Sequence, residues 1–513
     1  MNILANYIST YSHPPLVQSP PVYKPKRTKT SVMYTNDLHG QIPKMQRLVS
    51  ASKGAEIRAK QSGYDILKFS SGDTFIGSDE KRNYVAASFL NTSGMDAHAL
   101  GNHEFDITAS ICGNLLNNSN TKILGMNLNF PNNNSCLSRK IQRSTIVNGQ
   151  NGERYGVIGI QPTDLRDRIK KKEILEGITV DDKEQTIREL QQEVKLLQQQ
   201  GINKIFLLSH AGNAFEKEIA QRVSGIDVIF GGHSHELIEG VKSNENLFYS
   251  PTGEPVVITQ AGRDGNHFGL LDVEFDEYGT VKAVQNNVLD TNIYSPDPYM
   301  TQIVDATLGK SPEIGNLAHV DPIPKNNLLE ENPWADFVAD AIRTRLDADI
   351  VLINSANFRG SVDKGVVTER DITSIFPFNN KLFKVKLSEE DLVDAIKHCA
   401  KSLTSKNSKP GIMQVSGLTY KLDKQGNLVE LSYVDKNGHK RFIDVNDPDD
   451  GRIYTAVYDE FLVGGGDNME MLEKDDDEII ERYQFDKDKV TIDHIKTLRQ
   501  PFSVYKDGRI QIV

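Results

Sequence analysis

Side chains that commonly bind metal ions recur just after short apolar segments in the first half of this chain. A polar motif follows each of five such segments, at residues 31–35, 65–70, 97–100, 204–209 and 227–230. If these segments are strands, the polar side chains lie at the carboxyl edge of a sheet, where ligands bind in open α/β folds. The candidates are Asp37, His39, Asp73, Asn102, His210, His233 and His235. Imidazole and carboxylate groups suit Zn, Mn, Fe or Ni, so the pattern predicts a metal site.

The seven candidate ligands are more than one metal ion needs. Two ions that share one carboxylate would use all of them and leave positions for water and substrate. Such a pair of ions can clamp the attacking and leaving oxygens of an in-line phosphoryl displacement. The cysteines are too few and too scattered for a thiolate metal site or a disulfide framework: Cys112, Cys136 and Cys399. The pattern therefore favours phosphate-ester chemistry at a two-metal centre.

The segments between these motifs predict the fold that must position them. Residues 181–200 are typical of a helix, because Ile187, Leu190, Val194 and Leu197 recur at helical spacing and Gly201 follows. Alternation of such helices with short apolar strands predicts an α/β layered domain.

The ordered motifs resemble those of the calcineurin-like metallophosphoesterase superfamily. The resemblance rests on Asp37-x-His39, Gly72-Asp73, Gly101-Asn102-His103-Glu104, His210 and Gly232-His233-Ser234-His235. The longer forms GNHEFD, DLHG and SHAG resemble its 5'-nucleotidase family, and the match covers residues 31 to about 293. The resemblance implies a four-layer β-sandwich flanked by helices, followed by a smaller α+β substrate-binding domain.

The resemblance also implies roles for the site residues. One metal would be bound by Asp37, His39, Asp73 and His235, and the other by Asp73, Asn102, His210 and His233. A metal-bound hydroxide would attack phosphorus. His103 would stabilise the transition state or protonate the leaving oxygen, and Asp106 would orient His103. Glu104 has no predicted chemical role. We expect two divalent ions, with Mn, Zn or Co favoured.

The second half of the chain predicts a mixed α+β domain with its own ligand-binding motifs. A helix is expected over 299–308, another over 328–346 and a third over 391–400, with strands between and after them. Three polar-aromatic motifs, NSANFR, FPFNN and FLVGGGDN, resemble the substrate-binding domain of 5'-nucleotidases. The resemblance implies that Phe378 and Phe461 sandwich the base and that Asp467 binds ribose. It further implies that Asn354 and Arg359 contact sugar or phosphate, and that Asn380 contacts the base edge.

This chain departs from the family pattern at two places. Ala356 and Asn357 stand where the family commonly has glycines. Just before the helix near Asn332, where the family often has further arginines, this chain has Leu328, Leu329, Glu330 and Glu331. Lys325 is the nearest cation to the second place. We therefore expect phosphate binding in this domain to be weaker or differently specific.

Composition and charge restrict the function classes further. The 513 residues carry a formal net charge of -11, which argues against a nucleic-acid polymer or an anionic membrane as partner. The expected domains are a disordered proline-rich tail at 1–29, the metallophosphoesterase domain at 30–293, a linker at 294–312 and the substrate-binding domain at 313–513. The N-terminus has no basic region followed by a continuous apolar run, so a cytoplasmic protein is expected, although family members are often exported.

The predicted function is a metal-dependent phosphoric ester hydrolase that releases phosphate from nucleotides. Two alternatives use the same centre: a 2',3'-cyclic-nucleotide phosphodiesterase with 3'-nucleotidase activity, and a nucleotide-sugar pyrophosphohydrolase. A third alternative, from outside the enzymes, is a nucleotide-binding protein with an inactive centre. The sequence leaves oligomeric state open.

Overall fold

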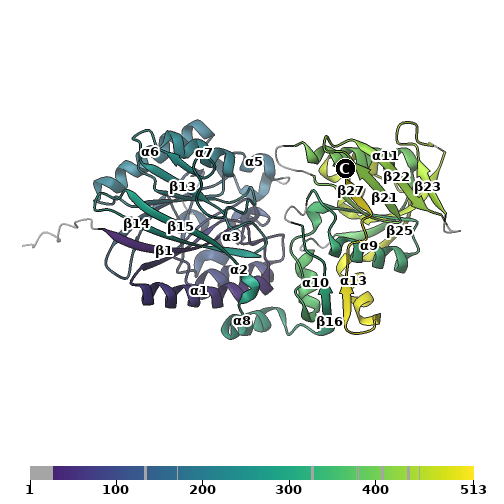
Figure 1. Ribbon diagram of the computed structural model, residues 1–513, viewed down its shortest axis with the longest axis horizontal. Helices are drawn as coiled ribbons and strands as arrows, with labels where there is room; N and C mark the ends of the chain where they lie inside the picture. The colour runs from purple at the N-terminus through teal and green to yellow at the C-terminus, as the bar shows by residue number, and fades with distance from the viewer. Residues whose placement is uncertain are drawn as a thin grey trace, which may run out of the picture.

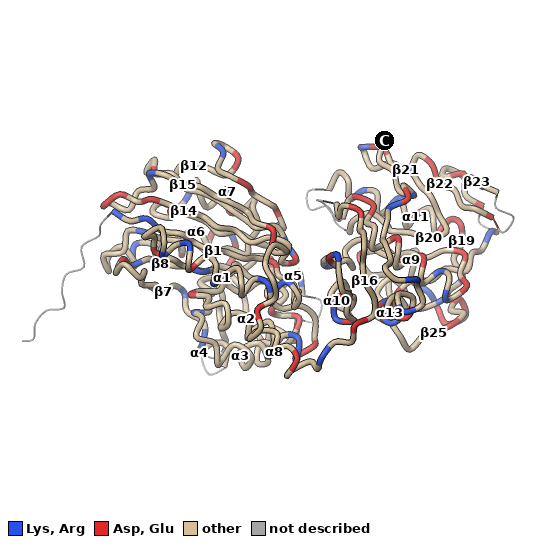
Figure 2. Tube along the Cα trace, turned by 60° about the horizontal axis from the view of Figure 1, so that its bottom comes forward, with Lys and Arg blue, Asp and Glu red and all other residues tan. Residues whose placement is uncertain are grey.

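The chain folds into two parts that lie side by side (Figure 1). The structure is a computed structural model and describes residues 27–131, 136–169, 172–324, 328–376, 378, 380–405, 410–435, 439–449 and 451–513. Most of the predicted tail, and Lys325, lie outside these residues. Acidic and basic residues occur throughout both parts (Figure 2).

Two β-sheets pack face to face in the N-terminal part. One has seven strands in the order β15 (Val281–Asp290), β14 (His267–Phe275), β1 (Thr28–Thr35), β2 (Asp65–Ser71), β3 (Ala97–Ala99), β4 (Lys122–Leu124) and β6 (Ile141–Gln142). The other has six strands in the order β12 (Leu247–Tyr249), β13 (Pro255–Thr259), β11 (Val228–Phe230), β10 (Ile205–Ser209), β8 (Arg154–Ile160) and β7 (Ser144–Asn148). A buried cluster between them includes Tyr34, Phe69, Phe206 and Phe230.

Helices cover the outer face of each sheet. The seven-stranded sheet is covered by α1 (Ile42–Ser62), α2 (Glu80–Thr92), α3 (Ala109–Asn117) and α8 (Pro298–Leu308), which share one apolar cluster. The six-stranded sheet is covered by α6 (Lys183–Gln199) and α7 (Asn213–Arg222), which share another. Helix, sheet, sheet and helix therefore make four layers, and the predicted fold class is confirmed.

Most predicted elements of the N-terminal part occur within a residue or two of their expected bounds. The helix expected at 181–200 is α6, whose N-cap Asp182 accepts a hydrogen bond from Gln185 N. One strand begins earlier than expected: Thr28 and Lys29, assigned to the tail, pair with Phe275 and Glu274 of β14. The tail prediction is wrong for these two residues because β14 extends far enough to pair with them.

The C-terminal part is built around a five-stranded mixed sheet. Its order is β20 (Met413–Ser416), β17 (Ile350–Asn354), β24 (Ile453–Asp459), β19 (Lys381–Ser388) and β25 (Ile479–Asp486). Helices α9 (Pro333–Leu346) and α13 (Lys487–Thr497) share one apolar cluster with this sheet, and α11 (Glu389–Ala400) shares the other. Two smaller sheets complete it: β18 (Gly365–Thr368), β16 (Glu313–Val320) and β26 (Phe502–Val504), and β23 (Lys440–Ile443), β22 (Leu428–Val434), β21 (Leu418–Leu422) and β27 (Ile510–Ile512).

One helix of the second half begins later than expected, whereas the helix expected at 299–308 occurs as α8. The helix expected from Leu328 begins only at Pro333, because Asn332 caps it by accepting a hydrogen bond from Trp334 N at 2.9 Å. Helix α8 lies in the predicted linker, yet its residues Met300 and Val304 are buried in the apolar cluster that it shares with α1. No helix among the described residues is both long and apolar enough to cross a membrane.

Candidate functional site

The seven predicted metal ligands lie together at the carboxyl ends of the two packed sheets. Six of them have donor atoms in groups within 4.8 Å: Asp37 with His39 and His235, and Asp73 with His210 and His233. A third such group, His39 with Asp73 and His103, overlaps both. The ligands come from the loops after β1, β2, β3, β10 and β11, as the strand pattern predicts. Segments nearly 200 residues apart in sequence therefore build one centre.

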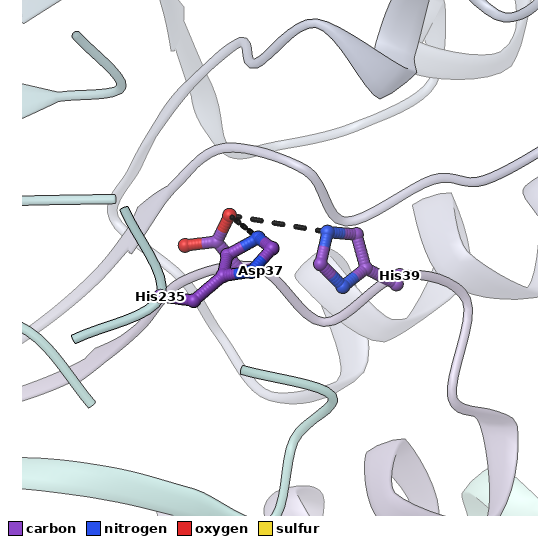
Figure 3. Close-up of side chains that lie close together, drawn as sticks. All are labelled: Asp37, His39 and His235. Carbon is purple, nitrogen blue, oxygen red and sulfur yellow. Dashed lines mark ion pairs between the residues drawn. The ribbon is translucent and has the colours of Figure 1, made fainter. Parts of the chain in front are cut away.

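Asp37 is the focus of the first group (Figure 3). Its Oδ1 lies 3.3 Å from Nε2 of His235 and 3.9 Å from Nε2 of His39. The loops that present these groups use the left-handed backbone region, with φ of 50° at Asp37, 45° at His39 and 60° at His235. Such conformations are costly for non-glycine residues and concentrate at functional sites.

Asp73 stands between the two groups. Its Oδ2 lies 3.0 Å from Nε2 of His210 and 3.5 Å from Nε2 of His39. One carboxylate oxygen therefore faces a histidine of each group, which is the position that a bridging ligand requires.

Three buried ligand atoms make no hydrogen bond: Nε2 of His39, Nε2 of His210 and Oδ1 of Asn102. Both histidine atoms face Oδ2 of Asp73 without forming a hydrogen bond to it. Burying a polar atom without a partner is costly, so such atoms mark places where a ligand is expected. All three belong to the predicted ligand set, and their chemistry suits a divalent transition metal. The residues present therefore fit the metals that the sequence predicts.

The electrostatics of the centre also call for positive charge. Burial disfavours the ionised form of Asp73, yet His210 and His103 hold its pKa well below the usual value. Burial likewise opposes charge on His210, but Asp73 and Asp37 raise its pKa to about 10. The buried carboxylates Asp37 and Asp73 therefore favour a positive charge between them.

Other buried groups fix how the ligands point. Nδ1 of His210 lies 2.6 Å from the carbonyl oxygen of Ser71, and Nδ1 of His39 lies 2.9 Å from Oδ1 of Asp264. With Nδ1 as the donor in each case, the Nε2 lone pair is left for a metal. Asn36 donates to Oδ2 of Asp37 at 2.7 Å. Sequence reasoning missed Asp264 and Asn36; the adjacency of Asn36 to Asp37 was the only local signal.

Glu104 has a structural role in the loop that carries Asp73. Its fully buried carboxylate accepts four backbone hydrogen bonds, from Asp73 N, Thr74 N, Phe75 N and Gly101 N, at 2.6 to 3.0 Å. A single side chain therefore satisfies most of the donors of this turn and ties the loops after β2 and β3 together. Glu104, for which the sequence predicted no chemical role, thus holds the loop of Asp73 in place.

His103 lies beside the metal ligands and is held by Asp106. Its Nδ1 is 2.7 Å from Oδ2 of Asp106, and its backbone N donates to Oδ1 of Asp73 at 2.8 Å. The His103 and His39 rings meet edge to face, with centroids 5.2 Å apart. Burial opposes protonation of His103, but Asp106 and Asp73 raise its pKa above the usual value. The imidazole is thus oriented and able to hold a proton.

Arg359 of the C-terminal part reaches the metal centre of the N-terminal part. Its guanidinium interacts electrostatically with Asp264, Asp73 and Asp106, and burial lowers its pKa. Gln41, just after the His39 loop, donates to the carbonyl oxygens of Arg359 and Ser374. The Arg359 guanidinium also lies 5.7 Å from the ring centroid of Phe378, so this ring is close to the centre.

The remaining predicted substrate residues lie in the same part of the chain. Asn354 Nδ2 donates to Oδ2 of Asp467 at 3.0 Å. Phe461 lies on α12 (Glu460–Val463), half-buried against the core, and Asn380 N donates to the carbonyl of Phe378 at 2.8 Å. The structure thus brings Asn354 to Asp467 and Arg359 to Phe378.

Two family models match the chain. Residues 30–237 match the calcineurin-like phosphoesterase family, and residues 313–474 match the 5'-nucleotidase C-terminal domain. The first range contains all seven predicted metal ligands, and the second contains all six predicted substrate-binding residues.

Several curated proteins are similar over most of this chain. The trifunctional nucleotide phosphoesterase protein YfkN of Bacillus subtilis is 26% identical over 85% of this chain, which spans only 32% of that protein. The probable 5'-nucleotidase of Treponema pallidum is 26% identical, with 86% of this chain and 87% of that protein covered. The 5'-nucleotidase of Bos taurus is 25% identical, with 94% and 90% covered.

Solved structures share the fold. The 5'-nucleotidase precursor from Thermus thermophilus superposes with a TM-score of 0.69 at 22% identity, covering 94% of this chain and 99% of that chain. The sulfate thiohydrolase SoxB from Thermus thermophilus superposes with a TM-score of 0.67 at 16% identity, covering 97% and 98%. Two proteins named for different substrates thus share this architecture, so the fold alone does not select the substrate.

Proposed function

Because the chain belongs to the 5'-nucleotidase family and is a metal-dependent phosphoester hydrolase, we propose that it releases phosphate from nucleotides at a centre of two divalent ions. The observation that carries the two-metal proposal is the set of unpartnered buried atoms on His39, His210 and Asn102. The two histidines belong to different groups of side chains, and both face Asp73.

The proposed ligand sets follow these groups. One ion would be held by Asp37, His39, Asp73 and His235, and the other by Asp73, Asn102, His210 and His233. When bound, such a pair supplies Lewis acidity and lowers the pKa of water toward neutrality. The donor set suits Mn, Zn or Co.

The chain's own residues would complete the chemistry. His103, with its raised pKa, would hold a proton at Nε2 for the leaving oxygen, while Asp106 binds Nδ1 and keeps the ring oriented. Arg359 would bind phosphate through its forked, permanently charged guanidinium. Phe378 and Phe461 would stack the base, Asp467 and Asn354 would contact the sugar, and Asn380 the base edge.

A second candidate is hydrolysis of 2',3'-cyclic nucleotides or nucleotide sugars at the same centre. It is favoured by the similarity to a protein named as a trifunctional nucleotide phosphoesterase. The absence of arginine at Leu329 and Glu330 also separates this chain from the family pattern in the substrate-binding domain.

A substrate panel tests the proposal. Purified protein would be loaded in turn with Mn, Zn, Co and Mg and assayed on nucleoside mono-, di- and cyclic phosphates, nucleotide sugars and p-nitrophenyl phosphate. We expect phosphate release to be fastest from nucleoside monophosphates and to be abolished by chelator. Asp73→Asn is the control for contaminating phosphatases. Hydrolysis of p-nitrophenyl phosphate without hydrolysis of any nucleotide would contradict the proposed substrate class, and faster cleavage of cyclic or sugar-linked nucleotides would favour the second candidate.

A further inference from the structure

Asn357 is a residue to which neither the sequence motifs nor the proposed mechanism gives a role. It lies in the short turn Ser355–Asn357 that follows β17, and only 5% of its surface is exposed. Both hydrogens of its side-chain amide have acceptors: Oδ1 of Asn354, and Oδ2 of Asp459 at 3.0 Å. Asn357, at a position where the family commonly has glycine, is therefore buried with both amide hydrogens bonded inside the protein.

The direction of these bonds is fixed by charge. Lys487 Nζ donates to Oδ2 of Asp459 at 2.5 Å, and both side chains are almost fully buried. A carboxylate paired with an ammonium group can only accept, so the nitrogen of the Asn357 amide must face Asp459. The same nitrogen then donates to the oxygen of Asn354.

This direction determines what Asn354 presents to Asp467. Since its oxygen accepts from Asn357, its nitrogen must point the other way, and it donates to Oδ2 of Asp467 at 3.0 Å. If Asn357 were absent, the buried oxygen of Asn354 would lose its donor, and the amide would be held only at its Asp467 end. The Asn354 side chain, and with it the Asp467 carboxylate, would then be less firmly positioned.

The network also reaches the helix that carries Phe461. Oδ1 of Asp459 accepts from Leu462 N at 3.2 Å and so caps α12, while Oδ2 accepts from Asn357 and Lys487. The Asp467 loop is itself held in the left-handed region, with φ of 58°. Asn357 thus bonds to Asp459, which caps the helix of Phe461, and to Asn354, which bonds to Asp467.

We propose that Asn357 is a positioning residue for nucleotide binding, which orients the Asn354 amide toward Asp467 and couples that carboxylate to the helix of Phe461. The inference rests on the proposed function, because it takes Asp467 and Phe461 as the groups that contact the ribose and base. It predicts that a residue that touches no substrate controls the affinity for the nucleoside half of the substrate.

A double-mutant cycle tests the proposal. Asn357→Ala, Asn354→Ala and the double variant would be assayed on AMP, or on the best nucleotide of the panel, and on p-nitrophenyl phosphate as a base-free ester. Losing the orienting bond should raise KM for the nucleotide by roughly 3- to 10-fold, with a smaller loss on the base-free ester. Because Asn357 acts through Asn354, the double variant should lose about as much as Asn354→Ala alone.

Two further variants separate positioning from folding. Asn357→Asp keeps the shape but replaces the donor with an acceptor facing Asp459, so its KM should rise at least as much as that of Asn357→Ala. Asn427→Ala is the matched control, because it removes an exposed amide–carboxylate bond of 2.7 Å to Asp423 in the turn between β21 and β22. It should change neither substrate's kinetics.

The outcomes are distinct. Additive losses in the cycle, an unchanged nucleotide KM in Asn357→Ala, or equal losses on both substrates with a lowered melting temperature would overturn the positioning role alone. A wild-type enzyme that hydrolyses p-nitrophenyl phosphate but no nucleotide would overturn the proposed function, and this inference with it.

Discussion

Oδ1 of Asp264 lies 2.9 Å from Nδ1 of His39, and neither side chain has any exposed surface. The contact leaves Nε2 of His39 facing Asp37 and Asp73. Carboxylates that orient a metal-bound histidine in this way typically contribute 10- to 100-fold to metal affinity. We therefore expect Asp264→Asn to weaken divalent-metal binding by roughly 10- to 100-fold, measured by calorimetric titration of the metal-free protein.

The control for this change is Asp272→Asn. Asp272 lies on β14, which pairs with β1 in the seven-stranded sheet, and forms an ion pair with Arg58 of α1. It belongs to neither group of ligands. Its variant should bind metal as the wild type does. Unchanged affinity in Asp264→Asn would mean that His39 is oriented without the carboxylate.

The position of Asp73 between the two groups predicts unequal effects of ligand substitutions. Asp73→Asn should lower the bound metal from about two ions per chain toward none, because it weakens both sites. His39→Ala should mainly weaken one site. Metal content after gel filtration, measured by elemental analysis, distinguishes them. Full occupancy and full turnover in Asp73→Asn would contradict a shared bridging ligand.

The metal ligands could be predicted from the sequence because each follows a strand within a few residues. Their spacing relative to the strand carries the information: Asp37 and His39 come directly after β1, and His233 and His235 directly after β11. The fold class could be predicted for the same reason, since the strands and helices alternate locally.

The orienting residues could not be predicted, because their roles depend on contacts between distant segments. Asp264 is 225 positions from His39, and no local pattern distinguishes it from an ordinary turn aspartate. Asn357 was recognised as a departure from the family, but its two acceptors lie on different segments, and only the fold brings Asp459 to it. The start of α9 was missed because an N-cap at Asn332 outweighed the apolar pattern before it.

The bond between His103 and Asp106 predicts a loss of rate without a loss of metal. His103→Ala should lower kcat by roughly 10²- to 10⁴-fold, the usual contribution of a general acid or base. Asp106→Asn should cost less, because it disturbs only the ring's orientation and charge. Bound metal should remain near the wild-type value in both. If His103→Ala strips the metal, the residue is a ligand and the assignment is wrong.

Asp336 predicts a pH dependence of stability. Burial, followed by the neighbouring Glu331, raises the pKa of its carboxyl to about 9. The unfolded chain ionises this group near pH 4, so between about pH 4 and pH 9 the folded protein holds a proton that the unfolded one has lost. The contribution of this group to the free energy of unfolding therefore falls as the pH rises through that window. Above the window it no longer changes with pH.

Asp336→Asn should remove this slope, because the amide is permanently neutral. Between pH 6 and pH 8 the wild type is expected to lose roughly 2 to 3 kcal/mol more than the variant in urea unfolding. Other titrating groups cancel in the comparison. If the unfolding free energies of the wild type and the variant change in parallel with pH, then Asp336 is ionised in the folded protein. Arg509, whose Nε lies 3.5 Å from Oδ1 of Asp336, would be the cause.

The proposed base-stacking rings, Phe378 and Phe461, predict a substrate-dependent loss of affinity. Phe378 is half-buried near Arg359, and Phe461 is half-buried against the core beside Gly466. Stacking on an aromatic ring contributes about 1–3 kcal/mol per base, so each alanine variant should raise the nucleotide KM by roughly 5- to 150-fold. Hydrolysis of p-nitrophenyl phosphate, which has no base, should fall much less.

Burial offers a competing explanation for both rings, and the two explanations predict different measurements. If a ring only fills the core, its removal should destabilise the protein by roughly 3–5 kcal/mol and reduce both activities together. The comparison between stacking and packing is sharper for Phe461, because its ring fits closely against Gly466. A Cβ added to Gly466 would lie only 2.5 Å from the ring. Phe378 is half-buried and lies beside the Arg359 guanidinium, so it should show the larger ratio of nucleotide loss to thermal destabilisation. Melting temperatures measured beside the two assays decide between stacking and packing for each ring separately.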